Sequence, residues 1–157
     1  MDTGLALKLE RTFDREYIRS IVVEMWNSIC EDGHSISDFE ADEYANCWVK
    51  MGDIGLYNLH PHNSSTLEIH AFILPEYRQE YAEASGVEIL KWLEGNVPEQ
   101  YQKVIAQVPF LYPNVKDFCV KNGFQIEGVN RLSHKKNGKL VNQWLLGITR
   151  DEIRGGL

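Results

Sequence analysis

The sequence predicts a mixed α/β domain with a mostly antiparallel sheet, one parallel pair of strands at its centre and helices on its sides. Stretches with the period of a strand alternate with stretches that have the period of a helix. A helical stretch separates the apolar strands expected at 67–73 and 104–108, which supplies the crossover that a parallel pair requires. An Asn-Gly step at 137–138 marks a hairpin near the end of the chain. With 157 residues, of which 43% are hydrophobic, we expect a single domain over 1–157.

The N-terminal elements follow from hydrophobic periods. Leucines alternate with other residues over 5–9, which predicts a strand with one buried face. From Asp14, a suitable N-cap, apolar residues recur at steps of three and four and predict an amphipathic helix that ends near Gly33. A short second helix is expected over 35–40, capped by a serine.

The middle of the chain contains the pattern of a hairpin followed by the central strand. Residues 45–50 and 54–59 are short apolar stretches separated by a turn that contains glycine. A polar loop follows at 61–65. Apolar residues then alternate over 67–73, and Pro75 halts the pattern where a strand should end.

The remaining elements are a helix, a strand, a short helix and a final hairpin. Residues 82–93 present one apolar helical face before a Gly-Asn stop. Residues 104–108 form a nearly continuous apolar run, as expected for a strand covered on both faces. A brief helix around Phe118 precedes the strands expected at 125–133 and 140–147.

Composition excludes several classes of protein. The formal net charge of −7 disfavours broad attraction to nucleic acid or to anionic lipid. No stretch approaches the roughly 18 apolar residues that a membrane helix needs, so we expect a cytoplasmic protein with neither membrane nor nucleic acid as partner. Cys30, Cys47 and Cys119 are widely spaced, which indicates reduced thiols rather than disulfides or a zinc site.

Two segments and the final hairpin resemble the GNAT family of N-acetyltransferases. The passage over 69–78, IHAFILPEYR, resembles the strand and Pro-x-x-Arg step that lead into the cofactor loop of that family. Residues 118–124, FCVKNGF, resemble its short helix ending in Gly-Phe, and the hairpin over 136–150 is similar to its closing strands. The resemblance covers about 66–150. It implies the GNAT fold, with the parallel pair splayed at the cofactor site, and acetyl-coenzyme A as cofactor.

Within this superfamily, the chain most resembles GNAT-like proteins of tailed bacteriophages, some of which are described as head-assembly proteins. In that group a Glu-x-His strand, a Leu-Pro-Glu-x-Arg loop and an Ala-rich helix also follow one another. The counterparts here are Glu68, His70, Leu74, Pro75, Glu76, Arg78, Ala82 and Ala84. The resemblance implies a phage-encoded protein in the cytoplasm of the host cell.

The resemblance also assigns the residues that would hold the cofactor. The backbone of Phe72, Ile73 and Leu74 would align the pantetheine, and the following loop and helix N-terminus would hold the phosphates. The loop residues are Arg78, Gln79, Glu80, Tyr81, Ala82 and Glu83. GNAT enzymes usually place glycines in this loop so that phosphates approach closely, whereas this chain has none there and adds two carboxylates.

Glu68 and His70 are the candidates for proton transfer at the acceptor amine. They are two residues apart on a predicted strand, so their side chains should share one face, opposite Leu67, Ile69 and Ala71. In GNAT enzymes this strand borders the acceptor, where either residue has the chemistry of a base. The alternative is a half-buried strand histidine beside an ordinary carboxylate.

Three further residues on or beside the short helix are candidates for roles in the reaction or in cofactor binding. GNAT enzymes frequently protonate the leaving thiolate with a tyrosine on the short helix, and Cys119 stands at that place. Cys119 is therefore either a proton donor or a small buried thiol, and Tyr112 is a second candidate donor. Asn114 either binds the pantetheine arm, as implied by the resemblance, or caps the short helix, and we favour capping.

A metal site is not predicted. The His60-Pro61-His62 triplet attracts attention, but the proline makes its local geometry awkward. No partner set with ligand spacing accompanies it, and GNAT chemistry requires no metal.

Two functions remain open on this basis. One is an acetyl-coenzyme A-dependent N-acetyltransferase acting on an amine of a protein or small molecule, which is favoured because Glu68, His70 and Arg78 fall where relatives use such residues. The other is a non-catalytic phage protein of GNAT fold that binds a host or virion protein, supported by the missing glycines and by Cys119. Related folds often dimerise through edge strands, so a homodimer is compatible with either function.

Overall fold

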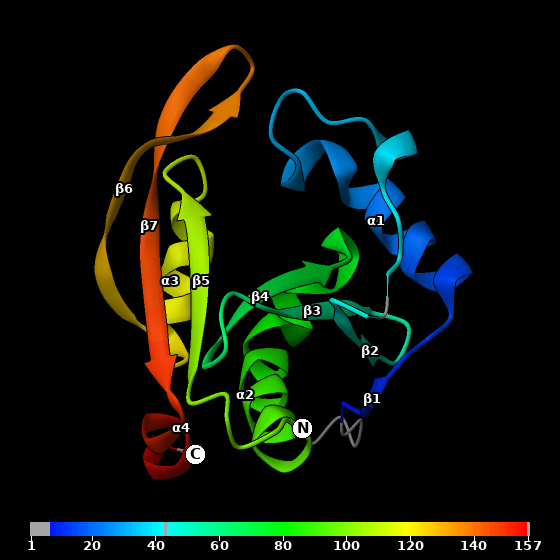
Figure 1. Ribbon diagram of the computed structural model, residues 1–157. Coiled ribbons are helices and arrows are strands. Elements are labelled where there is room, and N and C mark those ends of the chain that lie inside the picture. The colour runs from blue at the N-terminus through cyan, green and yellow to red at the C-terminus, as the bar shows by residue number, and fades with distance from the viewer. Residues whose placement is uncertain (1–6, 43, 157) are drawn as a thin grey trace.

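The protein is built around a seven-stranded sheet with the order β1-β2-β3-β4-β5-β7-β6, seen in a computed structural model that describes residues 7–42 and 44–156 (Figure 1). The strands are β1 (Leu9–Arg11), β2 (Cys47–Met51), β3 (Gly55–Pro61), β4 (Thr66–Ile73), β5 (Lys103–Pro109), β6 (Gln125–Lys136) and β7 (Lys139–Thr149). The helices are α1 (Arg15–Ile29), α2 (Arg78–Asn96), α3 (Pro113–Lys121) and α4 (Arg150–Gly156), with 3₁₀ turns η1 (Ile36–Asp38) and η2 (Pro75–Tyr77). The predicted mixed α/β class is confirmed.

The parallel pair at the centre is short. Strands β4 and β5 pair in parallel at Thr66, Leu67 and Glu68 of β4, and every other neighbouring pair of the sheet is antiparallel. Beyond Glu68 the two strands separate, while β5 stays paired with β7 as far as Pro109 (Figure 1). The predicted splay is therefore present, and it begins at Glu68.

Two apolar clusters cover the two faces of the sheet. Helix α1 packs on one face together with Trp48, Leu56 and Leu74. The larger cluster lies on the other face, where α2 and α3 pack against the alternate residues of the same strands, including Leu67 and Ile73. Because neighbouring side chains along β4 point to opposite faces, Leu67 and Ile73 pack into the larger cluster, whereas Phe72 packs against the cluster beside α1.

The N-terminal elements differ in extent from their predictions. Asp14 is the N-cap of α1 as expected, since its side chain accepts a hydrogen bond from the Tyr17 amide at 3.1 Å. The helix ends at Ile29, before the predicted stop near Gly33. The second helix is a single 3₁₀ turn, η1, capped by Ser35. Strand β1 begins at Leu9, and residues 5 and 6 of the predicted first strand lie outside the described residues.

The loop after α1 is fastened to the distant β6–β7 turn. The Asp32 carboxylate accepts hydrogen bonds from the amides of Asn137 at 3.0 Å and Gly138 at 2.8 Å. The Lys136 ammonium donates to the carbonyls of Asn27 and Cys30. These contacts connect the end of α1 with the turn of the long β6–β7 hairpin. They therefore hold together the parts of the chain that lie on either side of the gap between β4 and β5.

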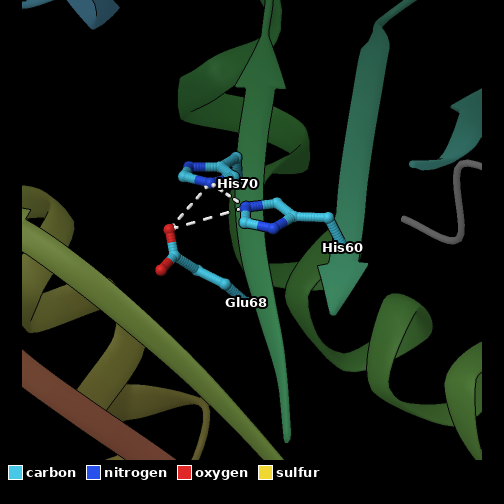
Figure 2. Close-up of side chains that lie close together, drawn as sticks. All are labelled: His60, Glu68 and His70. Atoms are coloured by element: carbon cyan, nitrogen blue, oxygen red, sulfur yellow. Dashed lines mark hydrogen bonds and ion pairs between the residues drawn. The ribbon is translucent and has the colours of Figure 1, made fainter. Parts of the chain in front are cut away.

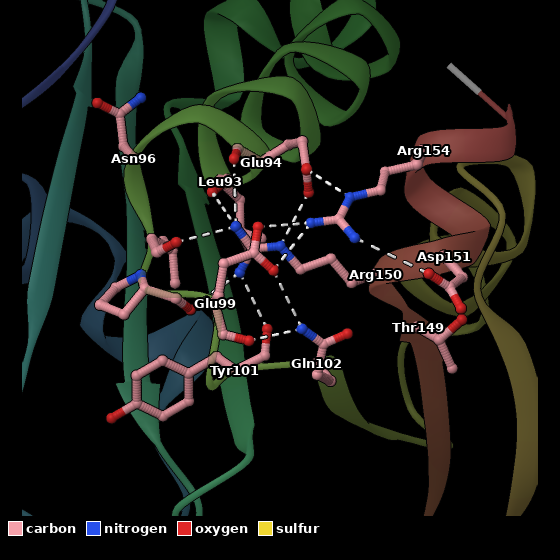
Figure 3. A network of polar contacts seen from close by, with 12 residues as sticks. Leu93, Glu94, Asn96, Glu99, Tyr101, Gln102, Thr149, Arg150, Asp151 and Arg154 are labelled. Carbon is pink, nitrogen blue, oxygen red and sulfur yellow. Dashed lines mark hydrogen bonds and ion pairs between the residues drawn. The ribbon is translucent and has the colours of Figure 1, made fainter.

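Helix α4 is the element that the sequence analysis did not predict. It follows β7 directly and begins at Arg150, whose side chain is only 1% exposed. The guanidinium donates hydrogen bonds to the Glu94 carboxylate at 2.8 Å and to backbone carbonyls that include those of Val97 and Tyr101 (Figure 3). Arg150 thus satisfies carbonyls at the C-terminal end of α2, which a helix leaves without intrahelical partners.

None of the helices in the described ranges is long and apolar enough to cross a membrane.

Candidate functional site

His60, Glu68 and His70 meet on one face of the β3–β4 pair (Figure 2). His60 lies directly opposite Glu68 in the antiparallel register, and His70 follows two residues later on the same face of β4. His70 Nε2 is 3.0 Å from Glu68 Oε2, and His60 Nε2 is 3.6 Å from the same oxygen. The two Nε2 atoms are 3.1 Å apart, and the rings are stacked with centroids 5.2 Å apart. The prediction that Glu68 and His70 share a face is confirmed.

A fourth side chain joins this group from β5. The Gln107 side-chain amide donates a hydrogen bond from Nε2 to Glu68 Oε1 at 3.0 Å. Glu68 is less accessible than the two histidines, with 12% of its side chain exposed, against 32% for His60 and 41% for His70. The carboxylate is therefore held from both sides of the splay, and the imidazoles remain open to solvent.

The three side chains form an ion-paired group. Hydrogen bonds from His60 and then His70 hold the pKa of the Glu68 carboxyl far below its ordinary value, against the opposing effect of burial. The hydrogen bond to Glu68 raises the pKa of His60 in turn, although burial of the ring opposes the shift. Glu68 is consequently an anion at neutral pH, and proton binding at His60 is favoured.

Cys119 is not brought together with Glu68 and His70. Those two residues are on the face of β4 that also carries Phe72 and packs against α1. Cys119 lies in the cluster on the other face, where it is buried among core residues of α2 and α3. Burial raises the pKa of its thiol to about 11, so the thiol keeps its proton at neutral pH.

The end of β4 offers backbone groups to the splay. The Leu74 amide donates to the Ile54 carbonyl, so Leu74 faces the β2–β3 hairpin. Hydrogen-bonded and non-hydrogen-bonded pairs alternate along an antiparallel ladder, so Phe72 also faces β3 and Ile73 faces the side from which β5 has separated. Of the three residues proposed for the pantetheine, Ile73 alone directs its backbone into the opening.

The Arg78 side chain also reaches this opening. Its Nε donates a hydrogen bond to the Ile73 carbonyl at 2.9 Å, so it lies across the end of β4. Arg78 is the first residue of α2, which starts immediately after η2. The sequence analysis predicted an apolar helical face only from Ala82, so the helix begins four residues earlier than expected. The predicted loop is therefore the first turns of a helix.

The other residues proposed for the cofactor surround the N-terminus of α2. Gln79, Glu80 and Glu83 are exposed there, whereas Tyr81 and Ala82 are half-buried. Glu80 lies in the first turn, where a carboxylate is stabilised by the positive end of the helix. It therefore competes with any phosphate for the same dipole.

Asn114 is an exposed residue in the first turn of α3. The N-cap of this helix is Tyr112, which makes no capping hydrogen bond through its side chain. The interpretation of Asn114 as the cap is therefore wrong. Its assignment to the pantetheine arm stays a prediction.

Sequence reasoning considered His60 only in the rejected metal triplet, and it missed Gln107. A hairpin closed symmetrically around the loop expected at 61–65 pairs His60 with Thr66, whereas the observed register pairs it with Glu68. Gln107 interrupts the apolar strand at 104–108, and a polar residue at such a place could have indicated a buried partner. The register of β3 with β4 brings His60 together with Glu68 and His70, three groups that could hold a metal ion, although the sequence analysis found no partner set for His60. The absence of a metal site stays a prediction.

Comparisons with known proteins find the same fold in solved structures of acetyltransferases. No protein-family model matches the chain, and no curated protein sequence matches it. A crystal structure of spermidine N-acetyltransferase from Vibrio cholerae in complex with CoA and spermine is similar, with a TM-score of 0.72, 18% identity, and coverage of 94% of this chain and 98% of that one. A chimera of the Vibrio cholerae enzyme SpeG with hSSAT gives a TM-score of 0.77 at 18% identity, over 94% of this chain and 98% of that one.

Mutant forms of the spermidine/spermine N-acetyltransferase SpeG from Vibrio cholerae are equally similar, with a TM-score of 0.77 at 18% identity. They match over 95% of this chain and 96% of theirs. At this identity the likeness concerns the path of the chain, not the residues of the site. The protein has the fold of these N-acetyltransferases, which is the GNAT fold that its sequence predicted.

Proposed function

We propose that the protein is an acetyl-coenzyme A-dependent N-acetyltransferase that acts on an amine. The observation that carries this proposal is the position of the ion-paired group, at the point where β4 and β5 separate. A backbone amide at Ile73 and the Arg78 side chain lie farther along the same opening. A thioester held along β4 would then have its carbonyl near His70.

His70 and Glu68 have different roles in the proposed proton transfer. When His70 Nε2–H donates to Glu68 at 3.0 Å, the lone pair of the imidazole is on Nδ1, which can accept a proton from the incoming ammonium. Glu68 fixes this tautomer and stabilises the imidazolium that forms, since its own low pKa makes it a weak base. The free amine then attacks the carbonyl carbon. A C–N bond forms, the C–S bond breaks, and coenzyme A leaves as a thiolate that takes up a proton. The attacking nitrogen gives up its second proton to solvent as the amide forms, and His70 then returns its own proton to solvent.

The source of that proton is a separate part of the proposal. Cys119 is the residue that the family resemblance offers, and Tyr112 is the second candidate. A thiol with a pKa of about 11 is a weak acid toward a thiolate whose conjugate acid has a pKa of about 8.5. Cys119 also lies in the core on the other face of the sheet, whereas a thiolate with this conjugate-acid pKa is protonated by neutral buffer, so proton uptake from bulk solvent is favoured over Cys119.

A cationic acceptor suits the charge of the protein. The net charge of −7 attracts polyamines, and Glu68 provides a half-buried anion beside the proposed base. One structural neighbour was crystallised with CoA and spermine. Spermine and spermidine are therefore the first acceptors to test.

The test begins with calorimetric titration of acetyl-coenzyme A and continues with assay of thiol release in the presence of spermine. We expect saturable binding that Arg78→Ala weakens, whereas Arg131→Ala, at an exposed site on β6, leaves it unchanged. His70→Ala should retain cofactor binding and lose turnover. Absence of cofactor binding in the wild-type protein would overturn the proposal.

A second function is favoured by one specific observation. The N-terminus of α2 carries Glu80 and Glu83 and no glycine, an arrangement unfavourable to a pyrophosphate. A non-catalytic phage protein that binds a host or virion protein would tolerate these residues. Undetectable cofactor binding, together with a stable complex with a purified virion protein, would support this alternative.

A further inference from the structure

We propose that His60, Glu68 and His70 form a binding site for a divalent transition-metal ion of the zinc class. The donors are two imidazole nitrogens and one carboxylate oxygen, which all lie within 4.8 Å of one another. Two histidines and a glutamate, with a further position open to water, make up one of the common coordination sets of protein-bound zinc. This site is independent of acetyl-coenzyme A, so it extends beyond the proposed transferase.

The distances between the donor atoms fit one shared ion. Zinc binds imidazole nitrogen and carboxylate oxygen at about 2.0–2.2 Å, so adjacent ligands of a tetrahedral site lie roughly 3.3–3.5 Å apart. The observed separations between His60 Nε2, Glu68 Oε2 and His70 Nε2 are 3.0, 3.1 and 3.6 Å. The three atoms therefore form nearly one face of a tetrahedron, and an ion would require shifts of only a few tenths of an ångström.

Protons alone satisfy this arrangement poorly. If both Nε2 atoms carry hydrogens that point to Glu68, two N–H donors of His60 and His70 face each other at 3.1 Å. If one of the nitrogens accepts instead, Glu68 loses a donor. A cation placed among the three atoms uses all three lone pairs at once, so the geometry suits a metal better than it suits any set of protons.

The surroundings hold the donor atoms as supporting residues do in metal sites. The Gln107 amide donates to Oε1 of Glu68, which leaves Oε2 directed at the two imidazoles. Such outer contacts fix the orientation of ligands and increase metal affinity. The donors also come from paired strands, whose register fixes their spacing.

The site is accessible, and its occupation has a consequence. His60 and His70 are 32% and 41% exposed, so an ion can enter from solvent and a water can complete its coordination. A bound ion would occupy His70 Nε2 and Glu68 Oε2 and would hinder the Glu68-assisted proton transfer proposed above. Zinc should therefore inhibit the transferase, and a chelator should restore it.

The experiment is calorimetric titration of the chelator-treated protein with zinc chloride, without acetyl-coenzyme A. We expect one ion per chain with a Kd in the micromolar range or below. His60→Ala and Glu68→Gln should each weaken binding at least tenfold. His62→Ala is the matched control, because His62 is an exposed histidine two residues from His60 and lies outside the ligand set.

Cobalt(II) provides a second readout that does not depend on enzymatic activity. We expect visible absorption bands of a low-symmetry site with nitrogen and oxygen ligands, and no thiolate charge-transfer band. Three results would overturn the proposal: no saturable zinc binding, equal affinity in His60→Ala, or a charge-transfer band that assigns the ion to a cysteine. Since the titration omits the cofactor, its failure leaves the transferase proposal standing.

Discussion

Gln107 on β5 donates a hydrogen bond to Glu68 on β4 at 3.0 Å, two residues beyond the last backbone pair between these strands, Glu68 with Ile105. The side chain thus continues the connection where the backbone ladder stops. It fixes one oxygen of Glu68 and leaves the other for the two histidines. The geometry of the site therefore depends on a residue that neither accepts a proton nor contacts the histidines in the proposed mechanism.

Replacing this residue should disturb the site without unfolding the protein. Gln107→Leu removes the donor to Oε1, so Glu68 can turn away from His70 and its pKa should rise. We expect a loss of about 10-fold or more in kcat and in zinc affinity, the range for residues that orient a ligand or base. Gln125→Leu is the control, because its amide donates to Glu152 on the surface. Equal kinetics in both variants would contradict the positioning role of Gln107.

The ion pair between His60 and Glu68 should make stability depend on pH. The pKa of His60 is raised above its ordinary 6.5, so its contribution is complete below that value and is lost as the pH rises through the folded pKa. The pKa of Glu68 is lowered from 4.5, so its contribution is complete above that value and is lost as the pH falls through the folded pKa. The pair therefore stabilises the fold most between about pH 4.5 and 6.5.

This window can be measured by thermal unfolding of the wild-type protein and His60→Gln across pH in the absence of metal. The difference in free energy of unfolding should reach only about 1 kcal/mol near pH 5.5, because water screens the partly exposed imidazole. It should shrink toward zero in alkaline buffer, because His60 then loses its charge. His62→Gln should follow the wild-type curve. A constant difference from pH 5 to 9 would mean that His60 acts through packing rather than charge.

Cys119 can be tested directly as the proton donor. Because burial raises the pKa of its thiol to about 11, we expect Cys119→Ala to change turnover by less than about threefold. The variant should lose about 1 kcal/mol of stability, since the sulfur fills space in the core. If turnover instead falls by about two orders of magnitude while acetyl-coenzyme A affinity is unchanged, Cys119 is the donor.

The order of elements was predictable because each segment carries its own local signal. The alternation over 67–73, the stop at Pro75 and the Asn-Gly turn specify β4 and the last hairpin without information from the rest of the chain. Their order also allowed the GNAT fold to be predicted. Helix α4 escaped prediction because it has one buried apolar residue, Ile153, and ends in glycines.

The site was predictable only where it lies within one strand. Glu68 and His70 share a face because side chains alternate along β4, and their spacing of two residues can be read directly from the sequence. His60 joins them through the register of β3 with β4, and a change of one residue in that register would turn it to the other face. Gln107 joins through the three-dimensional course of β5: its polar side chain in an apolar strand indicates a partner, but nothing local indicates that the partner is Glu68.

Arg150 is expected to be the most sensitive charged residue for stability. Its side chain is 1% exposed and donates to Glu94 and to several carbonyls around the end of α2 (Figure 3). Arg150→Met leaves those acceptors without a donor, so we expect a loss of about 3–5 kcal/mol in chemical denaturation. Arg154→Met is the control, because this arginine binds Glu94 and Glu99 from a side chain that is 40% exposed. Similar losses in both variants would contradict the special role of burial at Arg150.

Two glycines of α2 should respond to alanine in opposite directions. A Cβ atom at Gly86 would lie 2.6 Å from the side-chain amide of Asn122, which donates a hydrogen bond to the Phe118 carbonyl at the end of α3. A Cβ at Gly95 meets nothing within 4 Å. Alanine improves helix propensity by up to about 1 kcal/mol at either place, but overpacking at Gly86 costs about 1–3 kcal/mol. Gly95→Ala should therefore raise the free energy of unfolding, and Gly86→Ala should lower it.

A double-mutant cycle identifies the cause of the loss at Gly86. In an Asn122→Ala background the obstructing amide is absent, so Gly86→Ala should become neutral or stabilising. If Gly86→Ala remains equally destabilising in that background, the close approach of α2 and α3 at Asn122 is not what requires a glycine. If the sign reverses, the contact between Gly86 and Asn122 sets the distance between the two helices that cover this face of the sheet.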